Sequence, residues 1–249
     1  MQGPAELLPV SSSGHLVLVP ALLGQPYAGL DADIRKTFEV ALHAGAGVAL
    51  AWLRREEAVA DLRDPLGTAL LAAPAVLVAV AAEAWIEERA SDPLVAAVAQ
   101  IASGAALLLA DAFAPAARSL AANAPVLAGV GLAQAAALVP GVSRNGAALT
   151  AARALGFDRR QAMRLSWRAG LPVIGGAALL KSVRVAQRGL ARELWAPFAA
   201  GALAAFASTL AAAPLARLTQ RPWAPLAAYR IGLGALALRR LHRLQWPRG

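Results

Sequence analysis

Long, nearly uninterrupted apolar stretches constrain the fold of this chain more than any other feature. A helix needs about 20 residues to cross a hydrocarbon core, and several stretches approach that length. They are Phe38–Leu53, Leu66–Ile86, Pro93–Phe113, Trp167–Ala186, Trp195–Leu215 and Pro225–Leu238. Hydrophobic residues make up 58% of the 249 residues and charged residues only 16%, less charge than a water-soluble domain usually carries. The pattern predicts an all-α integral membrane protein with about six transmembrane helices.

Two further apolar segments are interrupted in the middle. Ala5–Leu23 is broken by Pro9 and a serine run, and Val126–Leu155 is broken by a Pro-Gly pair and a polar tetrapeptide. Each half is too short to cross a bilayer. Non-helical backbone at membrane depth is tolerated only where it is buried in protein or lines a wet cavity. We therefore expect two re-entrant helical hairpins.

The two breaks resemble each other, as Pro9-Val-Ser-Ser-Ser-Gly-His and Pro140-Gly-Val-Ser-Arg-Asn-Gly. The first precedes the first span and the second follows the third, so the hairpins would enter from opposite faces. Paired interruptions in two halves are typical of an inverted repeat with its site near the bilayer midplane. We expect one membrane domain, residues 1–249, built from halves 1–113 and 114–249.

The net charge of +9 does not indicate nucleic-acid binding here. Basic pairs such as Arg54-Arg55, Arg159-Arg160 and Arg239-Arg240 flank apolar runs, as residues that anchor helix ends against lipid headgroups do. The expected partners are membrane lipids. Tryptophans near the proposed span ends fit the same role, namely Trp52, Trp85, Trp167, Trp195, Trp223 and Trp246. The chain has no cysteine, which excludes disulfide and thiolate chemistry.

The first break places candidate catalytic groups together. Gln2 and Glu6 are four residues apart and share one helix face. Pro9 ends that helix, and the hydroxyls of Ser11, Ser12 and Ser13 can cap the next one. A helix N-terminus with hydroxyls beside it binds anions, and His15 would lie in its first turn.

The second break repeats this arrangement with a cation. Gly141 lies in the turn, Ser143 can cap the following helix, and Arg144 and Asn145 begin it. An arginine fork matches phosphate oxygens two at a time. A turn, a buried histidine or an interfacial arginine would each explain one of these residues alone. Ionisable groups at membrane depth are costly, however, and together they indicate a phosphoanhydride hydrolase.

These residues resemble the undecaprenyl-diphosphate phosphatase family, the bacitracin-resistance type. The matching motifs are Gln2-x-x-x-Glu6, Pro9-Val-Ser-Ser-Ser-Gly-His15 and Pro140-Gly-Val-Ser-Arg144, with Phe38-Glu39-Val40-Ala41 and Tyr229-Arg230 further along. The resemblance covers nearly the whole chain in order and spacing. It implies a multi-pass enzyme of the bacterial inner membrane, dependent on a divalent cation such as Mg²⁺ or Ca²⁺, with Glu6 as a plausible ligand. A homodimer is compatible with it.

The implied reaction converts undecaprenyl diphosphate into undecaprenyl phosphate and phosphate. It recycles the lipid carrier for peptidoglycan synthesis, and hence cell shape, and confers bacitracin resistance. We expect Ser12 to be the nucleophile, with Glu6 or His15 as base and Arg144 as clamp; attack by water or by His15 stays open. The remaining intramembrane charges, Glu39 and Arg230, would pair with each other or support the pocket.

Three positions depart from the family pattern. Asn145 replaces a serine, Ala148 replaces a threonine, and His43 replaces the usual glutamine. The missing threonine favours an alternative function, a polyprenyl-phosphate carrier or flippase that binds the same headgroup without hydrolysing it. A small-anion channel or transporter is a third reading. A carrier needs Arg144 and the helix ends, but it needs neither a nucleophile nor a base.

Overall fold

The computed structural model describes residues 1–82, 92–114, 122–188 and 191–245, and this part of the chain is helical without strands. The prediction of an all-α fold is confirmed. The helices are α1 (Gln2–Leu7), α2 (Ser12–Leu23), α3 (Ala32–Leu53), α4 (Arg55–Asp61), α5 (Pro65–Ala81), α7 (Pro93–Ala112), α8 (Ala124–Ala135), α9 (Arg144–Ala154), α10 (Arg159–Arg188), α11 (Arg192–Ala211) and α12 (Ala224–Gln245). Short 3-10 helices cover Pro26–Gly29, Ala136–Leu138 and Ala213–Gln220.

Most of the longer helices begin at a residue whose side chain accepts a hydrogen bond from the first turn. Such a cap satisfies backbone N–H groups that have no partner inside the helix. The capping residues are Ser11 for α2, Asp31 for α3, Asp64 for α5, Asp92 for α7, Asn123 for α8 and Ser143 for α9. The start of each of these helices is therefore determined by residues next to it in the sequence.

Each predicted span corresponds to one of these helices, namely α3, α5, α7, α10, α11 and α12. The last residues of the span Leu66–Ile86 lie outside the described residues, as do Trp85 and Trp246. By length and composition, α7 and α11 can each cross a membrane. The pair α4 and α5, bent by 98°, could form a third span. The structure thus supports a membrane protein, and the count of six spans stays a prediction.

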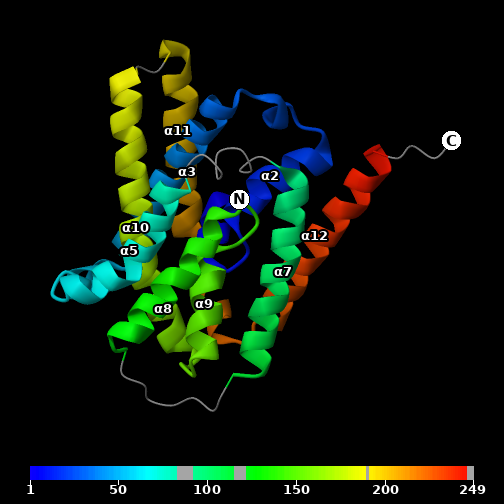
Figure 1. The fold of residues 1–249 in the computed structure, drawn as a ribbon. Coiled ribbons are helices and arrows are strands. Elements are labelled where there is room, and N and C mark those ends of the chain that lie inside the picture. Colours follow the sequence, from blue (N-terminus) through cyan, green and yellow to red (C-terminus); the bar gives the residue numbers. More distant parts are fainter. Residues whose placement is uncertain (83–91, 115–121, 189–190, 246–249) are drawn as a thin grey trace.

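Both interrupted segments have the predicted order of helix, break and helix. The first is α1 followed by α2, and the second is α8 followed by α9. The two breaks touch each other, since a Cβ atom added to Gly14 would lie 3.1 Å from the Cα of Gly141. Residues far apart in sequence thus meet at the two breaks, and the N-terminus lies near the centre of the view in Figure 1.

The helices contact one another in matching pairs. Helix α1 packs on α11 and α8 packs on α5, while α11 packs on α3 and α5 on α10. Helices α7 and α12 run side by side along one flank of the molecule (Figure 1). The first helix of each short hairpin therefore packs on a longer helix that is distant from it in sequence.

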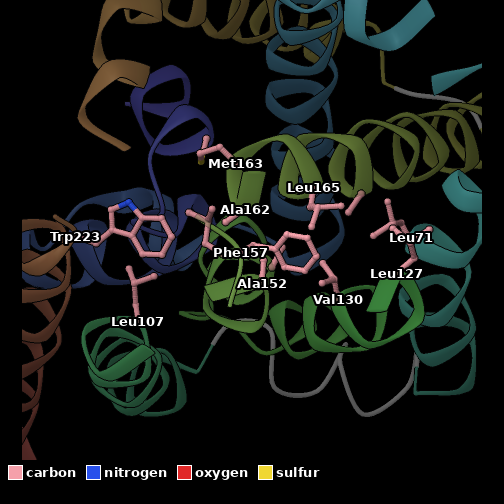
Figure 2. Packing of buried hydrophobic residues seen from close by; sticks show 13 residues of the cluster. Leu71, Leu107, Leu127, Val130, Ala152, Phe157, Ala162, Met163, Leu165 and Trp223 are labelled. Atoms are coloured by element: carbon pink, nitrogen blue, oxygen red, sulfur yellow. The ribbon is translucent and has the colours of Figure 1, made fainter. Parts of the chain in front are cut away.

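The largest hydrophobic cluster lies around α8, α9 and the start of α10. Figure 2 shows the rings of Phe157 and Trp223 among aliphatic side chains that include Leu107, Val130 and Leu165. Trp223 is fully buried and its indole N–H donates to the carbonyl of Thr219 at 2.7 Å. Its predicted role as an interfacial anchor is therefore wrong, because its ring packs in the core against residues of the second hairpin.

Candidate functional site

The first break is a tight turn at Ser11. This residue has φ 71°, the single non-glycine residue of the described chain with positive φ. Its side chain accepts a hydrogen bond from the backbone N–H of Gly14 at 3.2 Å and so caps α2. A bulky or ordinary L-residue avoids this backbone region, and such strain persists where the surroundings impose it. The turn aims the next side chain, Ser12, toward α1.

The second break has the same kind of serine cap, but no residue with a side chain adopts a positive φ there. Ser143 accepts a hydrogen bond from the N–H of Gly146 at 3.0 Å and caps α9. The positive φ, 93°, falls on Gly141, and a Cβ atom there would collide with the carbonyl oxygen of Ala96 on α7. Glycine is needed at this position for both reasons.

Arg230 of α12 joins the two breaks. Its side chain is fully buried, and it donates to the carbonyls of Pro9 at 3.0 Å and Gly141 at 3.2 Å and to the hydroxyl of Ser103. It thus does not pair with Glu39, whose carboxylate accepts from Tyr27 at 3.0 Å. Arg230 therefore holds the two breaks together instead of pairing with Glu39.

A second set of contacts ties the breaks together. Asn145 of α9 donates to the carbonyl of Leu7 at 3.3 Å and accepts from Ser166 of α10 at 2.8 Å. Gln100 of α7 donates to the carbonyl of Val10 at 2.9 Å. Asn145 therefore joins the two hairpins to each other, while Ser166 of α10 and Gln100 of α7 hold one hairpin each.

Glu6 is the centre of the polar cluster that these contacts assemble. Its Oε1 accepts from Ser12 at 3.0 Å and Gln2 at 2.9 Å, and it lies 2.7 Å from Nδ1 of His43. Its Oε2 faces Arg144 at 3.4 Å. The Glu6 carboxylate thus faces two basic side chains, His43 and Arg144, and accepts the hydrogen bond of the Ser12 hydroxyl. This contact places Glu6 where it can take the proton of that hydroxyl.

This cluster lines a cavity of about 500 Å³ that is mostly apolar. Its polar wall contains Glu6, Ser11, Ser12, Ser13, His43, Gln134, Ser143, Arg144 and Asn145. Its apolar wall comes from α5 and α10 and includes Val76, Val80 and Leu180, which are exposed at the protein surface. A polar end and an open apolar end suit an amphiphile.

His15 lies beside this cavity rather than in its wall. Its Nδ1 is 2.6 Å from the carbonyl oxygen of Ser11, and its Nε2 is 2.6 Å from the Tyr229 hydroxyl. The rings of His15 and Tyr229 are stacked with centroids 5.6 Å apart. The structure therefore brings Glu6, Ser12 and Arg144 together and turns His15 toward α12. Gly141 likewise serves the turn, not the cavity wall.

Sequence reasoning did not assign His43 and Tyr229 to the site. Both carried a signal: His43 was a departure from the family pattern, and Tyr229 precedes the buried Arg230. His43 lies 37 residues after its partner Glu6, and Tyr229 lies 214 residues after its partner His15. Contacts over such separations follow from packing and not from spacing.

The residues around Glu6 do not form a divalent-cation site on their own. Glu6 supplies one carboxylate, and both of its oxygens face donors. In the described chain no group of three or more His, Asp or Glu side chains is placed to hold a metal ion. Mg²⁺ and Ca²⁺ require six or more oxygen ligands, so most of them would have to come from elsewhere.

Residues 1–236 match the family described as "Bacitracin resistance protein BacA". The chain belongs to the BacA family. Similar proteins named "Undecaprenyl-diphosphatase" include one from Geobacter sulfurreducens, which is 39% identical over 96% of this chain and 94% of its own length. Another, from Pelobacter propionicus, is 39% identical over 94% and 91%. A third, from Trichlorobacter lovleyi, is 36% identical over 96% and 93%. BacA membership thus extends over nearly the whole chain, including both breaks.

Proposed function

We propose that this BacA-family protein hydrolyses undecaprenyl diphosphate to undecaprenyl phosphate and phosphate. The observation that carries the proposal is the Ser12 hydroxyl on the Glu6 carboxylate, opposite Arg144, in an amphiphilic cavity. The activity is the one in the names of its relatives. It would recycle the lipid carrier for cell-wall synthesis and confer bacitracin resistance.

In the proposed mechanism, Ser12 attacks the terminal phosphorus while Glu6 takes the hydroxyl proton. A bond forms between Oγ and phosphorus, the bond to the bridging oxygen breaks, and undecaprenyl phosphate leaves. Water then hydrolyses the phosphoserine and releases phosphate. Arg144 and the N-termini of α2 and α9 stabilise the charge on the transferred group. Direct attack by water with Glu6 as base uses the same groups.

The apolar wall supports a path for the prenyl tail. The cavity extends from the polar cluster to the gap between α5 and α10, where Val76, Val80 and Leu180 face the surroundings of the protein. An eleven-unit prenyl chain is too long for a cavity that holds about one drug-sized ligand. We propose that the first units occupy the cavity and that the rest of the tail lies in the bilayer.

The membrane arrangement belongs to the same proposal. Six spans in the inner membrane, with two re-entrant hairpins in an inverted repeat, agree with the matched packing of α1 on α11 and α8 on α5. Mg²⁺ or Ca²⁺ dependence is also proposed: Glu6 would be the protein ligand, and the ion would neutralise charge on the diphosphate. A homodimer remains part of the prediction.

The test is phosphate release from undecaprenyl diphosphate by detergent-purified protein, with and without EDTA. We expect release by the wild type and its loss in Ser12→Ala, Glu6→Ala and Arg144→Ala. Arg164→Ala is a matched control, because Arg164 is exposed on α10. A folded wild type that binds the lipid and releases no phosphate would refute the enzyme and leave the carrier. Release that EDTA does not reduce would refute the cation requirement alone.

A further inference from the structure

His15 has both ring nitrogens occupied by groups that fix its tautomer. A carbonyl oxygen can only accept, so Nδ1, 2.6 Å from the Ser11 oxygen, must carry the proton. In a neutral ring Nε2 then has a free lone pair, and the Tyr229 hydroxyl at 2.6 Å donates to it. The chain of donors therefore runs from Tyr229 through His15 to the backbone of Ser11.

The acceptor at the end of this chain is the strained residue of the first break. Ser11 has φ 71°, and its carbonyl accepts from the backbone N–H of His15 at 3.2 Å as well as from the ring. Two donors from one residue thus hold one peptide group. The orientation of that group fixes the direction in which Ser12 leaves the turn, and Ser12 reaches Glu6 at 3.0 Å.

We propose that His15 and Tyr229 are positioning residues, which hold the Ser11 peptide so that Ser12 meets Glu6, and that His15 transfers no proton in the reaction. Its ring is buried and does not line the cavity that holds Ser12 and Arg144. The inference rests on the proposed phosphatase function and assigns the base of that reaction to Glu6.

Two isosteric substitutions separate positioning from proton transfer. The amide nitrogen of asparagine can occupy the place of Nδ1, whereas that of glutamine reaches the place of Nε2. Neither amide can act as a base at neutral pH. We expect His15→Asn to keep phosphate release within about tenfold of the wild type, since the hydrogen bond to Ser11 survives. We expect His15→Gln and His15→Ala to lose about a hundredfold, because Ser11 loses its ring donor and Ser12 moves from Glu6.

Tyr229→Phe supplies an independent measurement. It keeps the stacked ring and removes the donor to Nε2, so the other histidine tautomer becomes accessible and we expect a loss of about fivefold. In the His15→Asn background the same change should have no further effect, because asparagine does not extend to Tyr229. A residue that only filled space would not show this loss of coupling.

The outcomes are distinct from those that test the proposed function. A wild type without phosphate release overturns the phosphatase and this inference with it. An active wild type with His15→Asn as inactive as His15→Ala overturns only the positioning role and returns His15 to proton transfer or nucleophilic attack. If His15→Gln does not fold, the comparison of His15→Asn with His15→Ala, together with the coupling to Tyr229, decides the same question.

Discussion

The two breaks share a backbone solution and differ in chemistry. In both, a serine caps the following helix through the N–H of a glycine three residues on, Ser11 with Gly14 and Ser143 with Gly146. In both, Arg230 binds a carbonyl of the turn. The first break then presents an acid, Glu6, and a hydroxyl, whereas the second presents a cation.

The positions of positive φ differ as well. The positive φ of the second break falls on Gly141, two residues before the cap, where a side chain would meet α7. The positive φ of the first falls on the cap itself, Ser11, whose side chain is needed for the helix start. Backbone strain therefore occurs at Ser11, which both caps α2 and orients Ser12. In the second break the positive φ falls on a glycine, which adopts it without strain.

Substitutions of Glu6 and Arg144 should separate chemistry from substrate binding. If the first break carries the reaction, Glu6→Gln should lower kcat by about a thousandfold or more with little change in KM, since the base is lost. Arg144→Ala should raise KM and also lower kcat by about a hundredfold, because the guanidinium of Arg144 binds the diphosphate in both the ground state and the transition state. Steady-state phosphate release over a range of lipid concentrations measures both. Equal changes in KM for the two variants would contradict the division of roles.

Arg230 tests whether the breaks depend on one shared support. Arg230→Met removes three charged hydrogen bonds and leaves the carbonyls of Pro9 and Gly141 without that donor, so we expect a loss of about 3 kcal/mol in stability. Thermal unfolding in detergent measures the effect. Arg240→Met, an exposed position on the same helix, is the control. An unchanged unfolding midpoint for Arg230→Met would show that the breaks are held by other contacts.

The two positions with positive φ should differ in their response to substitution. Gly141→Ala adds a Cβ atom at positive φ against Ala96, so we expect it to destabilise the protein by about 2 kcal/mol. Ser11→Gly relieves backbone strain while losing a cap, and these terms should nearly cancel, to within about 1 kcal/mol. Gly175→Ala, where an added Cβ meets open space, is the control for detergent unfolding. A larger loss for Ser11→Gly than for Gly141→Ala would reverse the assignment of strain.

The smallest expected effect lies in the contact between the breaks at Asn145. Asn145→Ser is too short to bond both Leu7 and Ser166, so we expect a loss of about 1 kcal/mol in stability. Ser166→Ala should cost less in the Asn145→Ser background than in the wild type, since the two residues share a hydrogen bond. Strict additivity in the unfolding measurements would show that this bond contributes nothing.

Much of the fold could be predicted because it depends on short-range sequence patterns. The helices over Pro93–Ala112 and Arg192–Ala211 follow from apolar length, and the break before Ser12 follows from Pro9 and the serine caps. The exposure of tryptophan could not be predicted this way. Trp223 lies at the start of an apolar helix, as anchors do, yet packing around Phe157 buries it.

The chemical groups of the site and the starts of the helices follow from the sequence alone. Glu6, Ser12, Ser143 and Arg144 were candidates because ionisable and capping groups stand out in an apolar chain. Which of these groups contact one another depends on the tertiary structure. It placed His43 on Glu6, joined the two breaks through Arg230, and turned His15 from the cavity toward Tyr229. The physical reason is that capping and hydropathy act within a few residues, whereas these contacts are set by the packing of helices from both halves of the chain.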